Sequence, residues 1–250
     1  MTREPTEGPE EARTGHRPQF ARALGRALVG TYDHLGLLAV ATFLWGLAIG
    51  LPLAGATALL RGVWVVLAAA LVLVPASAAA NAALFHLARL IALREPASLG
   101  ALGEGVRRLA RPSLGLAALL AGVGGAILGN AAFYLTVLRE SRLAVVMGFV
   151  CLYLLGLLGM MSLYAYPLLA MRGEGPLRAL KKSALLALDN VGFTLLLATF
   201  TAAVTALVVL PVIMGTPYLV GLSALIALFV YAGFFALLAN HALLELLKQY

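Results

Sequence analysis

Few residues of this chain are of a type that could do chemistry, and two of them are aspartates in matching positions. Asp33 and Asp189 each stand just before a long apolar run. Ionisable groups near a membrane core are functional candidates, so the two carboxylates could couple a proton or a cation to transport. Each could instead accept hydrogen bonds from the free amides of the following helix. Both interpretations stay open, and capping is favoured because it is common.

Polar side chains within the apolar runs form a second group of candidates. His86 could carry a proton or bind a metal, but no histidine, cysteine or carboxylate lies three or four residues from it. Asn81, Asn130 and Asn240 need hydrogen-bond partners in apolar surroundings, and asparagines therefore often link helices. If these three face one another, they line a small polar interior suited to a neutral or lipid-like solute. Structural linkage is the favoured interpretation.

Signatures of the common enzyme classes are absent from the sequence. It contains no Gly-x-Ser-x-Gly element, no phosphate-binding loop and no dinucleotide fingerprint. Carboxylates paired for hydrolysis are also missing. The single cysteine, Cys151, lies in an apolar run and cannot form an internal disulfide. We therefore expect no catalytic residue, no cofactor and no metal site, and a protein that is not an enzyme.

The composition indicates a lipid environment for these residues. Hydrophobic residues make up 62% of the 250 residues and charged residues 12%, against about half and a quarter in soluble domains. The net charge is +7, but the basic residues lie in short segments between apolar runs. This distribution argues against a nucleic-acid partner and favours anchoring to anionic lipid headgroups.

Six apolar runs are each long enough to span a bilayer, which takes about 20 residues. A backbone in hydrocarbon must satisfy its own hydrogen bonds, so the runs are predicted to be helices. Short breaks join them in three pairs, which predicts three tight hairpins. The runs are 35–60, 63–88, 114–138, 143–170, 191–211 and 218–244.

The positions of lysine and arginine predict the orientation. In a six-span arrangement 15 of the 18 basic residues fall on one side, and only Arg61, Arg139 and Arg142 fall on the other. Basic loops stay in the cytoplasm. We therefore expect a multi-pass protein of a bacterial cytoplasmic membrane with both termini in the cytoplasm. Residues 1–17 contain four glutamates, two prolines and two glycines, which predicts a short disordered tail.

The longer basic connections have the pattern of amphipathic helices lying in the membrane interface. Leucines recur at helical spacing beside the charged residues of each connection. Such a helix is either a connector lying on lipid, the favoured interpretation, or a docking surface for a cytoplasmic partner. Besides anionic lipid, the expected partner of the whole protein is another membrane protein. The candidate lipid or partner surface consists of Arg107, Arg108, Arg178, Lys181 and Lys182.

An internal repeat organises these elements. The segment from Arg22 to Asp33 resembles the segment from Arg178 to Asp189, with the same spacing between arginine and aspartate. Repeats of this kind indicate the architecture of the whole chain. We expect one domain, residues 18–250, built as an all-α transmembrane bundle of three parallel repeats near 18–94, 95–172 and 173–250. Each unit is predicted to be an interfacial helix followed by a hairpin.

Several short motifs resemble those of the YesL-like family of bacterial multi-pass membrane proteins. They are Leu44-Trp45, Leu51-Pro52, Pro75-Ala76, Ala80, Arg94-Glu95, Ser98-Leu99, Gly105, Ser113, Asn130–Tyr134 and Leu180–Asn190. The stretch between Leu51-Pro52 and the following small residues is longer here than is usual in that family.

The resemblance implies a cytoplasmic-membrane protein, sometimes associated with carbohydrate uptake systems, and implies no catalytic residues. The functional hypothesis is a non-enzymatic accessory or scaffold subunit, linked to a solute uptake system. The alternative is a small transporter or channel for a lipid-like or neutral solute that uses the asparagine-lined interior.

Overall fold

The computed structural model describes residues 18–59, 63–214 and 217–248. All regular structure in these residues is helical, and six helices are long and apolar enough to cross a membrane. The predicted fold class, an all-α bundle of six membrane helices, is therefore confirmed. The predicted disordered tail, residues 1–17, lies outside the described residues.

The first and third predicted units have the same order of elements. In each, a 14-residue helix ends at an aspartate, and one residue separates it from the first long helix of a hairpin. The last helix of the chain contains a π-helical turn, η3, between α8 and α9. The helices are α1 (Phe20–Asp33), α2 (Leu35–Leu59), α3 (Val63–Ala92), α6 (Pro176–Asp189), α7 (Val191–Met214), α8 (Pro217–Ile226), η3 (Ala227–Tyr231) and α9 (Ala232–Leu247).

The middle unit differs from the prediction, because its interfacial segment and its first span form one helix. This helix, α4 (Gly100–Ala132), passes through Pro112 and ends in a π-helical turn, η2 (Phe133–Val137), before α5 (Arg142–Arg172). A proline inside a helix costs about 3 kcal/mol. The cost is offset here by a continuous buried stripe that packs along α3 on both sides of the proline: Ala101, Gly105, Leu109, Ser113 and Leu116.

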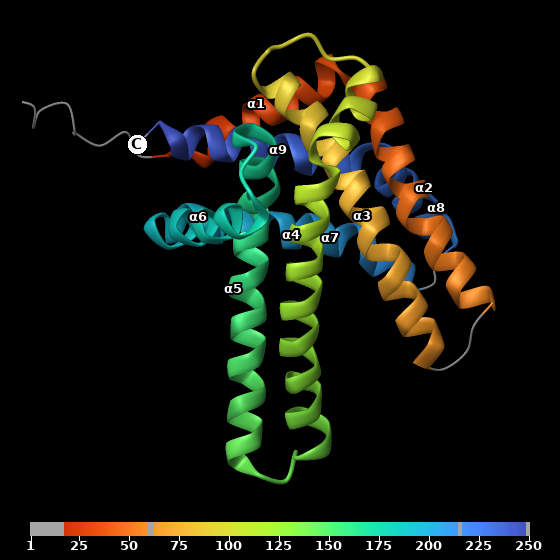
Figure 1. The fold of residues 1–250 in the computed structure, drawn as a ribbon, viewed down its shortest axis with the longest axis vertical. Helices are drawn as coiled ribbons and strands as arrows, with labels where there is room; N and C mark the ends of the chain where they lie inside the picture. Colours follow the sequence, from red (N-terminus) through yellow and green to blue (C-terminus); the bar gives the residue numbers. More distant parts are fainter. Residues whose placement is uncertain (1–17, 60–62, 215–216, 249–250) are drawn as a thin grey trace, which may run out of the picture.

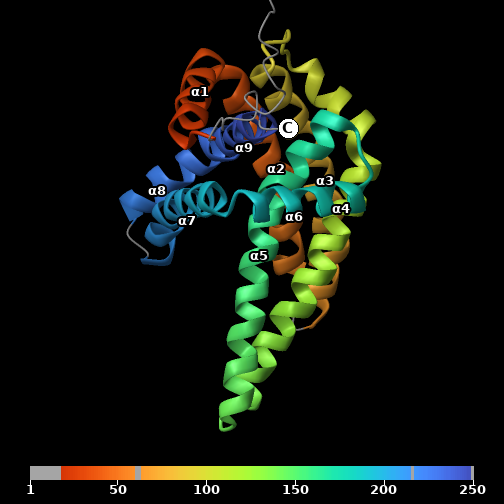
Figure 2. The same ribbon diagram turned by 90° about the vertical axis from the view of Figure 1, so that its left-hand side faces the viewer.

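The helices do not all run in one direction. Figure 1 shows α4 and α5 as an antiparallel hairpin that extends well beyond the rest of the molecule. Figures 1 and 2 together show that α6 and α7 run across the direction of this hairpin, and that α1 and α9 gather at the end opposite its turn. Helix α9 is central, because it contacts α1, α2, α3 and α5. The third unit is thus turned relative to the first two.

Buried residues recur at the same spacing along the three predicted units. Three fully or largely buried alanines, Ala23, Ala101 and Ala179, lie 78 residues apart. The same period relates three further buried residues, Leu87, Ala165 and Leu243. Equivalent positions thus face the protein in each unit. This agreement supports the repeat as a proposal about how the chain is built.

The basic helices α1 and α6 pack mainly through small residues and expose several leucines. Helix α1 buries Ala23, Ala27 and Thr31, and helix α6 buries Ala179, Ser183, Leu186 and Ala187. Leu28, Leu177, Leu185 and Leu188 are more than half exposed, whereas Leu24 and Leu180 are partly buried and pack against the core. Small residues allow close helix packing in membranes, and the exposed leucines remain available to acyl chains.

Candidate functional site

A cavity of about 410 Å³ lies inside the helical domain, and we call it the aromatic cavity. Its walls come from α2, α3, α4, α5, α7, η3 and α9. None of the described residues that line it is charged. The residues that give it its character are Trp45, Asn81, Phe85, Ser162, Tyr166, Thr201, Tyr231 and Phe235.

Asn81 is the polar centre of the aromatic cavity. The Trp45 indole N–H donates to Asn81 Oδ1 at 2.8 Å, which links α2 to α3. Asn81 also interacts with the Tyr166 hydroxyl of α5. The Tyr166 ring stacks on Phe85 with the ring centroids 5.4 Å apart. One asparagine therefore positions two aromatic side chains from two other helices.

Hydroxyl groups at the cavity wall donate to their own helices. Ser162 donates to the Gly159 carbonyl at 2.6 Å, and Thr201 donates to the Leu197 carbonyl at 2.8 Å. Their remaining lone pairs can accept a hydrogen bond from a ligand. The cavity thus combines aromatic faces with a few uncharged polar atoms, which suits a neutral molecule with an apolar body.

The other two predicted asparagines do not complete this cavity. Asn130 is exposed on α4 and donates to the Ala126 carbonyl of its own helix. Asn240 is fully buried in α9 and donates to the Ala236 carbonyl, but it is not among the residues that line the cavity. Its Oδ1 atom has no hydrogen-bond partner within the described ranges. The expected meeting of three asparagines is therefore replaced by Asn81 with aromatic partners.

His86 is buried where α3 and α4 approach most closely. A Cβ atom added to Gly105 of α4 would lie 2.7 Å from His86 Cβ. The His86 Nε2 atom has no hydrogen-bond partner among the described residues. In the same part of the chain no group of three or more histidine, cysteine or carboxylate side chains is placed to hold a metal ion.

Asp33 and Asp189 lie in two separate grooves, so they do not form a pair. Each is the last residue of its helix, and one residue, His34 or Asn190, stands between it and the following span. Each aspartate was expected to be the cap of the following span, but it lies one position before the cap position. Asp33 lines a groove beside α1 and α9, and Asp189 lines another with Arg172 and Lys182.

Charge pairing divides the predicted basic surface. Arg108 forms an ion pair with Glu104 at 2.7 Å, and Lys182 forms one with Glu174 at 2.5 Å. The side chains of Arg107, Arg178 and Lys181 are exposed. Three of the five residues thus present an exposed charge, and the other two are paired with a glutamate, although the Arg108 side chain stays 67% exposed.

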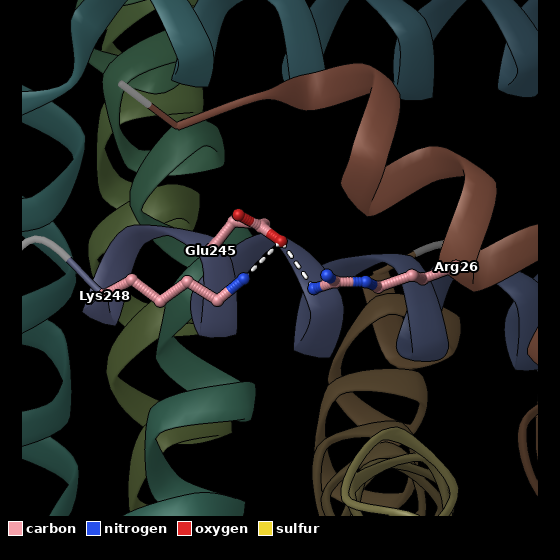
Figure 3. A network of polar contacts seen from close by, with 3 residues as sticks. All are labelled: Arg26, Glu245 and Lys248. Carbon is pink, nitrogen blue, oxygen red and sulfur yellow. Dashed lines mark hydrogen bonds and ion pairs between the residues drawn. The ribbon is translucent and has the colours of Figure 1, made fainter. Parts of the chain in front are cut away.

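A buried ion-pair network at the end of the chain was not among the sequence candidates. Glu245 of α9 is fully buried, and its Oε1 atom accepts from Arg26 at 2.5 Å and from Lys248 at 2.7 Å (Figure 3). Arg26 belongs to α1, so the network joins the first and last helices of the chain. The sequence signal was a single acidic residue immediately after the last apolar run.

Comparison with known proteins identifies no match for this chain. No protein-family model, no curated protein and no solved structure matches the chain. The resemblance to the YesL-like family therefore remains a prediction.

Proposed function

We propose that this integral membrane protein binds an uncharged, amphipathic molecule in the aromatic cavity and carries it within or across the bilayer. The observation that carries the proposal is a cavity of about 410 Å³ whose described lining residues are all uncharged, in which Asn81 positions Trp45 and Tyr166. A long-chain alcohol or a similar lipid with one hydroxyl or carbonyl group has the matching chemistry. We propose no catalytic role for the protein.

Quenching of Trp45 fluorescence tests the proposal. In a Trp64→Phe background Trp45 is the remaining tryptophan of the two in the chain. A brominated long-chain alcohol should quench it saturably in detergent, and the matching brominated fatty-acid anion should quench it less because the cavity offers no cation. Asn81→Leu should weaken alcohol binding roughly three- to tenfold, through the loss of a hydrogen-bonding anchor.

Asn130→Leu is the matched control, because Asn130 is an exposed asparagine outside the cavity. It should leave quenching unchanged. Equal, unsaturable quenching by alcohol and anion in all variants would count decisively against the proposal.

A second candidate function is that of a scaffold for another membrane protein, with the cytoplasmic membrane as its location and both termini in the cytoplasm. The observation in its favour is that α6 exposes Leu177, Leu185 and Leu188 together with Arg178 and Lys181. Such a face fits a partner with acidic groups at the membrane surface.

Charge reversal tests the scaffold function. Changing Arg107, Arg108, Lys181 and Lys182 to glutamate should remove proteins that co-purify in mild detergent. Because Lys182 pairs with Glu174, a variant that keeps Lys182 serves as the control for folding. Unchanged co-purification in both variants would exclude these residues as the docking surface.

A further inference from the structure

A second hollow, which we call the charged groove, lies at the end of the molecule where α1 and α9 meet. It has a volume of about 740 Å³ and is formed by α1, by His34 before α2, by the end of α3 and its connection to α4, and by α9. Its charged lining residues are Arg26, Asp33, Arg94 and Glu95. It shares no lining residue with the aromatic cavity.

Two charged side chains in the charged groove have no hydrogen-bond or ion-pair partner among the described residues. Arg26 forms an ion pair with Glu245 at 2.5 Å, and Glu95 lies 3.8 Å from Arg89 of α3. The side chains of Asp33 and Arg94 make no hydrogen bond or ion pair within residues 18–59, 63–214 and 217–248. The groove thus offers one available cation and one available anion.

The backbone at Arg94 supports a role for its side chain. Helix α3 is followed by Arg94 at φ 59°, a left-handed conformation in which a Cβ atom is strained and glycine is usual. Helix α5 ends in the same way, and there the residue is Gly173 at φ 62°. Arginine therefore occupies a position where glycine would cap the helix more easily. Strained residues of this kind concentrate at binding sites.

An apolar surface adjoins the charged groove along α1. Val29 lines the groove and is 61% exposed, and Leu28 and Tyr32 are exposed beside it. An amphipathic helix at a membrane surface places such side chains among acyl chains, with its polar groups at headgroup level. A lipid could therefore lie along α1 with its headgroup in the groove.

We propose that the charged groove binds the headgroup of a phospholipid that carries a phosphate and a primary ammonium group. Arg94 binds the phosphate, because a guanidinium group matches two phosphate oxygens. Asp33 accepts hydrogen bonds from the ammonium group. A trimethylated headgroup has no N–H to donate, and a glycerol headgroup has no positive charge, so both bind more weakly.

Lipid titration of the full chain in detergent, followed by native mass spectrometry, tests this site. Phosphatidylethanolamine should bind roughly tenfold more tightly than phosphatidylcholine or phosphatidylglycerol, as expected for one charge-assisted contact. Free phosphoethanolamine, the same headgroup without acyl chains, should bind much more weakly. Equal affinity for the three lipids, or for the free headgroup and its lipid, would overturn the proposal.

Variants separate binding from folding. Arg94→Gly should keep or raise the melting temperature, because glycine suits the left-handed cap, yet weaken phosphatidylethanolamine binding roughly tenfold. Asp33→Asn should weaken binding of phosphatidylethanolamine and leave phosphatidylglycerol unchanged. Asp189→Asn, at the matching position of α6 and outside the groove, should change neither. If Arg94→Gly folds and binds phosphatidylethanolamine like the unchanged protein, the site is not a headgroup site.

Discussion

Glu245 is a buried carboxylate. Its charge is stabilised by two cations whose side chains reach the surface, Arg26 and Lys248. The Arg26 side chain is 50% exposed and the Glu245 side chain is fully buried. Removing the arginine leaves a buried anion with a weaker set of contacts, whereas removing the anion leaves two cations that can still reach water. A buried charge that has lost its partner destabilises a protein strongly. Removing Arg26 should therefore cost more stability than removing the charge of Glu245.

At this network we predict that Arg26→Gln destabilises the protein by about 2 kcal/mol, since a hydrogen bond to a charged group is lost. Adding Glu245→Gln should restore part of the stability, because the buried charge is then removed. The measurement is the free energy of unfolding in mixed detergent. Arg22→Gln, on the same helix and exposed, is the control. A double variant less stable than Arg26→Gln would contradict the argument.

Between elements, the contact of α3 with α4 depends on a glycine. A Cβ atom at Gly105 would lie 2.9 Å from the Ala82 carbonyl oxygen and 3.0 Å from Ala83 Cα. These are backbone atoms, so they cannot move aside as a flexible side chain does. Two residues earlier, a Cβ atom at Gly103 would meet nothing within 4 Å. The same substitution should thus have opposite effects at the two positions.

We predict that Gly105→Ala destabilises the protein by about 1–3 kcal/mol, because it forces the two helices apart. Gly103→Ala should stabilise it by up to about 1 kcal/mol, because alanine favours helix over glycine. Thermal unfolding of the two variants in one detergent measures the difference. Melting temperatures that shift in the same direction would show that α3 and α4 do not pack as described.

Over the whole molecule, the apolar surface points to lipid as the surrounding medium. Helix α5 exposes Leu143, Phe149 and Tyr153 by 63–72% and carries no charge between its terminal arginines. Soluble monomers rarely expose apolar surface on this scale. In Figure 1 the turn between α4 and α5 lies far from α1 and the start of α4, so these parts would meet opposite sides of a bilayer.

We predict the orientation that the basic residues favour. A reporter fused after Tyr250 should be active only in the cytoplasm, and one inserted in the 138–141 turn only outside. Alkaline phosphatase and a fluorescent protein report the two sides. Arg139→Glu together with Arg142→Glu should leave this result unchanged, because acidic residues contribute little to orientation. Two reporters on one side would refute the six-span arrangement.

The sequence predicted well what depends on local pattern. The apolar runs predicted the six long helices, because helix formation in lipid requires only an uninterrupted apolar segment. Asp33 and Asp189 were expected to cap the following spans, but each is the last residue of the preceding helix. The predicted separation of the middle interfacial helix from its span was wrong, because α4 packs along α3 continuously through Pro112.

The candidate site was only partly predictable. Asn81 was identified as polar, but its partners Trp45 and Tyr166 belong to other helices. Asn130 gave the same signal and proved to be exposed. A side chain's type indicates that it needs a partner, but the residue that supplies the partner depends on how helices far apart in the sequence are rotated against each other.

By itself the sequence determined the solvent of the chain, the helical state of its backbone and the approximate positions of the six apolar spans. Each of these follows from residues close together in the chain. Only the tertiary structure decided that α7 crosses the α4–α5 hairpin, that α9 lies at the centre, and that Glu245 meets Arg26. Such features depend on side-chain packing between distant segments, because lipid solvates every apolar helix face alike and so does not select which faces pair.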